Sequence, residues 1–155
     1  MEFFESIKSE LDQLPSYEVI HLVQVVQSLQ VTIEKISDFV TEPKNLEYGR
    51  NVIYRSEHVE VIVLMLPSMA RTLIHDYGTS QGCILAVEGS LINFLYTFES
   101  ADAEPVYKGL EEISEGDFFT IEGDTFHMMY NPTASPVVTF HVYTPPLGGG
   151  IVSPL

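Results

Sequence analysis

The sequence predicts a mainly β protein, a β-barrel or sandwich, preceded by a short helical segment. Its 155 residues are enough for one domain. The hydrophobic period changes once, near residue 45, from helical spacing to short runs rich in Val, Ile, Phe and Tyr. Those runs are separated by turn signals such as Glu88-Gly89 and Glu115-Gly116. The predicted strands are VEVIVLML, GCILAVEG, LINFLYTF, DFFTI and VVTFHVY.

The helical segment covers about residues 1–42 and is expected to pack on a barrel formed by residues 47–146. Apolar residues from Phe4 to Leu14 follow a helical period, and Pro15 ends that helix. Ser16 is predicted to cap a second helix that runs through Val26. A third, short helix is predicted from Thr32 to Val40. The closing GGGIVSPL is expected to form a loose tail.

Charge and composition make several classes of partner unfavourable. Seven Lys and Arg residues against 22 Asp and Glu residues give a formal charge of −15. Such a surface repels nucleic-acid phosphates and anionic lipid, so we expect neither nucleic acid nor membrane as a partner. The sequence has no apparent secretion signal and no apolar run long enough to span a membrane. A single cysteine, Cys83, rules out an internal disulfide and fits a cytoplasmic protein.

Three of the five histidines lie in the β region and are candidates for chemistry. His21 lies in a helical stretch and His58 follows a turn, so both are expected to be structural or solvated. The segment HDY places His75 and Tyr77 on one face of a predicted strand, because side chains alternate with period two. Two such residues can ligate one metal ion. The pair is equally compatible with a histidine that lines the barrel and hydrogen-bonds a tyrosine.

The spacing of the residues around these two is that of a degraded cupin signature. In the first block His75, Tyr77 and Gly89 have the expected spacing, and Gly82 stands where a glutamate is usual. In the second block Gly116, His127 and Asn131 have the expected gaps, while Glu122 and Asp124 replace a proline and a glycine.

Longer strings carry a more specific resemblance. YGRN at Tyr48 to Asn51, HDYGTSQGC at His75 to Cys83 and FHVYTPPL at Phe140 to Leu147 resemble strings of the bacterial cysteine dioxygenases. This family is the thiol dioxygenase branch of the cupin superfamily, and the resemblance covers Tyr48 to Pro146. It implies a cupin jelly-roll β-barrel, a monomer, and a cis peptide at Thr144-Pro145.

The resemblance also implies a role for each matching residue. His75, Tyr77 and His127 occupy the three iron-ligand positions, with Tyr77 where histidine is expected. Arg50 matches the arginine that holds the substrate carboxylate, and Tyr48 lies beside it. The catalytic positions are those of Tyr143 and His141, with a hydroxyl at Thr139. Gly82 takes the place of the cysteine that animal members cross-link to the tyrosine. Cys83 is one residue later and on the other strand face, so no cross-link is expected.

The implied activity is Fe(II)-dependent oxidation of L-cysteine by O2 to cysteine sulfinic acid. Neutral imidazoles leave Fe(II) open positions, and an arginine clamps a carboxylate with two parallel hydrogen bonds. Tyr77 is the departure, because a phenol must lose a proton to ligate well and then favours Fe(III). The alternative is a non-catalytic or metal-deficient cupin that binds cysteine or a related small acid. The interpretations weighed against these roles are that Arg50 pairs with a surface glutamate, and that Tyr143 and His141 are a satisfied polar pair inside the barrel.

Overall fold

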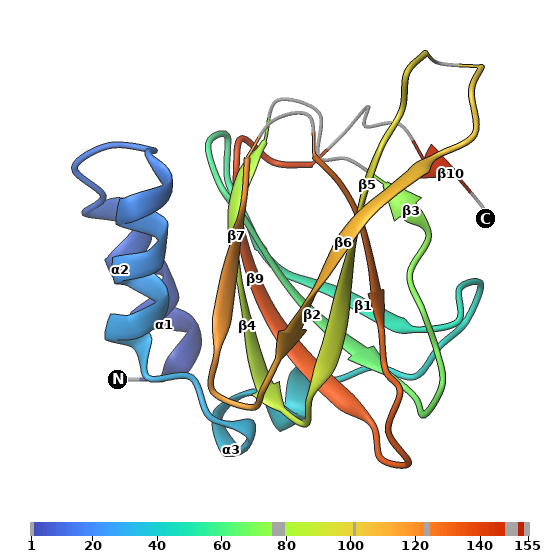
Figure 1. Ribbon diagram of the computed structural model, residues 1–155. Helices are drawn as coiled ribbons and strands as arrows, with labels where there is room; N and C mark the ends of the chain where they lie inside the picture. The colour runs from blue at the N-terminus through green and yellow to red at the C-terminus, as the bar shows by residue number, and fades with distance from the viewer. Residues whose placement is uncertain (1, 76–79, 101, 123–124, 148–151, 154–155) are drawn as a thin grey trace.

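A computed structural model describes residues 2–75, 80–100, 102–122, 125–147 and 152–153. Two five-stranded antiparallel sheets face each other and enclose an apolar core (Figure 1). Each sheet contains strands from distant parts of the sequence, so the chain passes repeatedly from one sheet to the other. This arrangement agrees with the predicted mainly β, jelly-roll architecture.

The N-terminal helices are α1 (Phe3–Asp12), α2 (Val19–Leu29) and α3 (Ile33–Ile36), followed by the 3-10 helix η1 (Ser37–Phe39). The prediction for α2 was wrong at its start, because the helix begins at Val19 and its N-cap is Glu18. The Ser16 hydroxyl lies two residues before that cap. It accepts the Glu18 N–H and contacts His21 Nδ1 at 2.6 Å. Ser16 therefore orders the turn that precedes the helix and binds His21, which is structural as expected.

The first sheet, which we call the covered sheet, has the order β1 (Gly49–Arg55), β2 (Glu60–Leu66), β9 (Val137–Thr144), β4 (Gln81–Glu88) and β7 (Phe118–Ile121). Its central strands β2 and β9 are buried along their whole length. On β2 the odd-numbered residues from Val61 pack with the helices, and the even-numbered residues from Ile62 face the barrel interior. Burial on both faces explains why these strands are almost continuously apolar.

The second sheet, which we call the open sheet, has the order β10 (Val152–Ser153), β3 (Ile74–His75), β8 (Phe126–Tyr130), β5 (Leu91–Thr97) and β6 (Val106–Ile113). It lies on the side of the barrel away from α1 and α2 (Figure 1). Aromatic side chains of β5 and β6, such as Phe94 and Tyr107, contact each other there, and Tyr107 is exposed. The predicted loose tail was wrong in part, because Val152 and Ser153 pair with β3.

Two turns require glycine, as the motif spacing suggested. Gly89 and Gly116 have φ angles of 80° and 89°, a region that other residues adopt only with strain. The Thr144-Pro145 peptide is cis, as the family resemblance implied. Within the described residues, no helix combines the length and the apolar character needed to cross a lipid bilayer.

Candidate active site

The polar residues singled out in the sequence meet at a narrow cavity between the two sheets. It has a volume of about 40 Å³. Both sheets and the segment before β1 contribute to its wall, which is formed by Tyr48, Arg50, Ile62, Leu64, Thr72, His75, Met129, His141, Tyr143 and Leu147. Five of the seven predicted site residues therefore line one cavity.

His75 and His127 are directly opposite each other on neighbouring strands of the open sheet. They are paired in the β3–β8 register, so their Cβ atoms project to the same side, about 5 Å apart. That side is the barrel interior, because Met129, two residues from His127, belongs to the interior core. Of the predicted strand through HDY, only His75 lies among the described residues, in β3. Tyr77 falls in 76–79, outside the described residues.

Hydrogen bonds fix the orientation of both imidazoles. His75 Nδ1 lies 2.6 Å from the Leu73 carbonyl oxygen, which can only accept, so Nδ1 carries the proton and Nε2 the lone pair. Ligating histidines are usually held in this way by a carbonyl or carboxylate. His127 Nδ1 lies 3.0 Å from Asn93 Nδ2 and 3.3 Å from Asn93 Oδ1. The Asn93 amide in turn donates to Glu111 Oε1 at 3.2 Å.

Burial keeps His127 and His141 neutral. Desolvation and, to a smaller extent, the proximity of His75 lower the pKa of His127 to about 4. Desolvation also lowers the pKa of His141 to about 3, with contributions from His75 and Arg50. Neutral imidazoles are the form that binds metal ions. Within the described residues, no three His, Cys, Asp or Glu side chains are grouped to hold a metal ion, so His75 and His127 form an incomplete ligand set.

Tyr143, His141 and Thr139 form a hydrogen-bonded chain along the inner face of β9. The Tyr143 hydroxyl lies 2.5 Å from His141 Nδ1, and the Thr139 hydroxyl lies 2.6 Å from His141 Nε2. All three residues are buried. Alternation along a strand places residues 139, 141 and 143 on one face, which is the arrangement that the resemblance implied.

Gly82 and Cys83 lie on opposite faces of β4. Gly82 is paired with Tyr143 in the register, and a Cβ atom at residue 82 would lie 2.4 Å from a Tyr143 ring carbon. The close approach of the tyrosine ring therefore requires glycine here. Cys83 is fully buried among the residues that pack against the helices, where desolvation raises the pKa of its thiol to about 12. The expected separation of Cys83 from Tyr143 is confirmed.

Arg50 faces the cavity but is also near a carboxylate. It is paired with Leu64, whose side chain lies in the interior core. Its Nη2 atom is 4.0 Å from Glu60 Oε1, and its side chain is 39% exposed. The carboxylate near Arg50 is thus that of the buried Glu60 and not of a surface glutamate. The distance between Arg50 Nη2 and Glu60 Oε1 is too long for a hydrogen bond. Tyr48 borders the same cavity, and burial raises the pKa of its phenol against the opposing effect of Arg50.

Comparisons with known proteins agree on the architecture. No protein-family model matches the sequence. A conserved protein with a double-stranded β-helix domain from Klebsiella pneumoniae has a TM-score of 0.61 and 16% identity, over 76% of this chain and 93% of that chain. A sugar phosphate isomerase of the cupin superfamily from Silicibacter pomeroyi has a TM-score of 0.52 and 17% identity, over 64% and 60% of the two chains. The chain folds as a cupin.

Enzymes are among the cupins with this architecture. An oxalate oxidase has a TM-score of 0.58 and 9% identity, over 76% of this chain and 60% of that chain. At identities this low, the structural similarity establishes the fold alone. The reaction depends on the residues of the site.

Asn131, which has the spacing of the second cupin block, has a structural role. Its buried amide donates to the carbonyl oxygens of Leu66, Pro67 and Ser135. These bonds tie the end of β8 to the end of β2 and the start of β9. Asn131 therefore holds the barrel together at a distance from the cavity.

Sequence reasoning missed two polar residues next to the predicted site. Glu60 contacts Arg50, and Asn93 contacts His127. Both are almost fully buried. Each stands within a run of apolar residues, VEVIVLML and LINFLYTF. A single polar residue inside such a run was the available signal, because a buried polar group needs a partner.

Proposed function

We propose that this cupin is an iron-dependent thiol dioxygenase that oxidises L-cysteine to cysteine sulfinic acid. The observation that carries the proposal is that three kinds of group open onto one cavity. These are an imidazole with its lone pair on Nε2 at His75, a guanidinium at Arg50 and a phenol at Tyr143. The imidazole can ligate a metal ion, the guanidinium can bind a carboxylate, and the phenol can donate a proton. Oxidation of a small thiol acid needs all three.

The two imidazoles fit Fe(II) as part of a ligand set. His75 and His127 project from paired positions on one face, and burial favours the neutral form of His127, the form in which histidine binds metal. Fe(II), when bound, supplies open positions at which a thiolate and O2 meet. The overall reaction adds both oxygen atoms of O2 to the sulfur, and the thiol hydrogen becomes the proton of the sulfinic acid.

Arg50 and Tyr48 are the proposed carboxylate site. A guanidinium that is not engaged in a short ion pair keeps its parallel N–H groups for a bidentate bond to the substrate carboxylate. Because burial raises the pKa of Tyr48, its phenol stays protonated and serves as a further hydrogen-bond donor. A carboxylate fixed on β1 directs the rest of the amino acid toward the histidines on the open sheet.

Tyr143 is the proposed proton donor, and His141 orients it. Because His141 is neutral, one ring nitrogen donates and the other accepts. If Thr139 donates to Nε2, then Nδ1–H donates to the Tyr143 oxygen. In that tautomer the phenol proton points away from His141 and can be donated to an oxygen in the cavity.

The alternative function is a cupin that binds cysteine or a related small acid without turning it over. Tyr77 favours this alternative, because a phenolate at a ligand position stabilises Fe(III) over the Fe(II) that the reaction needs. The carboxylate site and the Tyr143 chain serve binding as well as catalysis. Both functions therefore predict cysteine binding, and they differ in iron content and sulfinic acid formation.

Iron analysis of protein purified without added iron, followed by an assay of sulfinic acid from cysteine in air, separates the two functions. The Tyr77→His variant is expected to raise both iron per chain and sulfinic acid formation, because it adds a neutral imidazole. A variant that fills with iron yet makes no sulfinic acid supports the binding protein. Wild-type protein with full iron and turnover, both unchanged in Tyr77→His, would show that residue 77 is not a ligand.

A further inference from the structure

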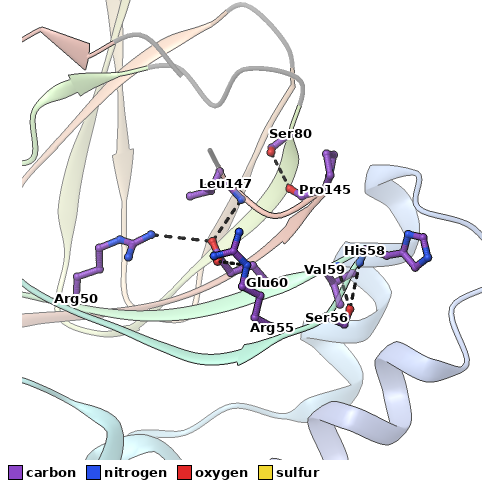
Figure 2. Close-up of polar contacts among 9 residues, drawn as sticks. All are labelled: Arg50, Arg55, Ser56, His58, Val59, Glu60, Ser80, Pro145 and Leu147. Carbon is purple, nitrogen blue, oxygen red and sulfur yellow. Dashed lines mark hydrogen bonds and ion pairs between the residues drawn. The ribbon is translucent and has the colours of Figure 1, made fainter. Parts of the chain in front are cut away.

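Two charged residues near Arg50, Arg55 and Glu60, have no role in the proposed function. Glu60 begins β2 and Arg55 ends β1, and the two are directly opposite in the β1–β2 register. Glu60 is also paired with Tyr143 on its other side. Register pairing places all of these side chains on the interior face. The turn between Arg55 and Glu60 is held by Ser56, whose hydroxyl accepts the N–H groups of His58 and Val59 (Figure 2).

Glu60 is a buried carboxylate with two cationic neighbours. Its side chain is 2% exposed, and Arg55 Nε lies 3.4 Å from Oε2 while Arg50 Nη2 lies 4.0 Å from Oε1. A buried carboxylate is stable only when charges and hydrogen bonds compensate it. Arg55 provides the shorter ion pair, which leaves Arg50 attracted toward Glu60 without a hydrogen bond to it. Figure 2 shows both guanidinium groups directed at the one carboxylate.

Glu60 also holds the cavity wall. The Leu147 N–H donates to Glu60 Oε1 at 3.3 Å, and Leu147 lines the cavity. The same segment is fixed a second time, because the Ser80 hydroxyl donates to the Pro145 carbonyl oxygen at 2.7 Å. One carboxylate therefore connects the arginine on β1 with the C-terminal segment that closes the cavity (Figure 2).

We infer that Glu60 and Arg55 set the charge of the carboxylate site, so that it accepts ligands with one carboxylate and discriminates against those with two. This inference rests on the proposed role of Arg50. Two guanidinium groups and one carboxylate leave a single net positive charge beside the cavity, whose buried histidine, His141, is neutral. The first ligand carboxylate neutralises that charge. In the metal-free protein a second one enters a narrow cavity with no cation left for it, near the buried Glu60 carboxylate.

The test uses two ligands of the same size that differ by one charge, succinamate and succinate. Binding of each to the metal-free full chain is measured by calorimetry at low ionic strength, where screening is weak. We expect the wild-type protein to bind succinamate about tenfold more tightly than succinate, from one uncompensated charge a few ångströms away. The ratio of the two affinities is the readout, because a loss of folding or of general affinity lowers both values together.

Two variants should move that ratio in opposite directions. Glu60→Gln keeps an oxygen for the Leu147 N–H but leaves two net positive charges, so the preference for succinamate should disappear. Arg55→Gln removes the compensating cation at a side chain that is 60% exposed, so the preference should grow beyond that of the wild-type protein. Glu57→Gln is the matched control, because the Glu57 side chain is 88% exposed and contacts His58, and it should leave the ratio unchanged.

The outcomes separate this inference from the proposed function. If the wild-type protein binds both ligands equally, or if neither variant changes the ratio, the role of Glu60 and Arg55 is wrong while the carboxylate site stands. If no protein binds either ligand and none binds L-cysteine, both the carboxylate site and the inference are wrong. Should Glu60→Gln fail to fold, the widened ratio of Arg55→Gln still decides the question.

Discussion

The two sheets contribute different halves of the candidate site. The covered sheet carries Arg50, Glu60 and the chain from Tyr143 to Thr139, and its other face packs against the helices. The open sheet carries His75 and His127 and lies on the side of the barrel away from α1 and α2. The proposed substrate recognition and proton donation therefore belong to the sheet that the helices cover, and the proposed metal ligation to the other.

This division teaches that substrate affinity and metal affinity should be separable. Arg50, His141 and Tyr143 line the cavity from the covered sheet, and His75 and Met129 line it from the open sheet. A substitution on one sheet should therefore change one property and leave the second unchanged. The following predictions test that separation, from the largest expected effect to the smallest.

His127→Ala should abolish tight metal binding, with a loss greater than the 10–100-fold typical of residues that only orient a ligand. It removes one of the two imidazoles that face each other across β3 and β8. The measurement is the dissociation constant for Fe(II) under anaerobic conditions. His58→Ala, at an exposed histidine that is not among the residues lining the cavity, is the control. Unchanged metal affinity in His127→Ala would contradict the metal site.

Arg50→Ala should weaken L-cysteine binding by roughly 30-fold or more, the usual cost of losing one partner of a buried charge pair. Metal content should stay at the wild-type value, because Arg50 lies on the covered sheet. Calorimetric titration with cysteine and metal analysis of the same preparation check both halves. A variant that lost metal together with cysteine affinity would show that the two sheets are not independent.

Asn93→Ala should lower metal affinity by about 10–100-fold, because Asn93 orients the His127 ring. Cysteine affinity of the metal-free protein should be unaffected. Asn51→Ala offers a matched control on the covered sheet, where the Asn51 amide donates to the Phe39 carbonyl oxygen. Equal metal affinities in the two variants would remove Asn93 from the site.

Lowering the pH should destabilise the metal-free protein, because each sheet contains a buried histidine with a lowered pKa. Burial lowers the pKa of His127 to about 4 and that of His141 to about 3, whereas both approach 6.5 when the chain unfolds. The unfolded state then binds more protons, so stability falls as the pH drops from about 6.5 toward 4, by about 1.4 kcal/mol per pH unit for each histidine. Urea unfolding between pH 7 and 5 measures the slope.

Replacing one of these histidines should reduce that slope. His127→Asn removes the contribution of the open sheet, and His141→Gln removes that of the covered sheet. Because the two contributions are predicted to be similar, each variant should lose a similar part of the pH dependence. A slope that neither variant changes would mean that other groups cause the acid sensitivity.

The sequence predicted the structure best where a residue pattern is compatible with a single local structure. The apolar runs around Val61 and Phe140 predicted buried strands, and the family resemblance implied the hydrogen-bonded chain from Tyr143 through His141 to Thr139. β6 was missed, because its sequence VYKGLEEI is mostly exposed and lacks an apolar run. Glu60 and Asn93 were missed because their partners lie on neighbouring strands, and pairing across strands is decided by the fold.

The burial of Cys83 provides a reporter of opening motions. The chain has one thiol, it is inaccessible, and its pKa of about 12 leaves it almost entirely protonated near neutral pH. A thiol reagent can therefore label the protein only after the helices separate from the covered sheet. Under native conditions the labelling rate, compared with that of an unfolded control, gives the equilibrium population of that open form. A single alkylation reaction thus measures how firmly α1 and α2 are attached to the barrel, with no engineered probe.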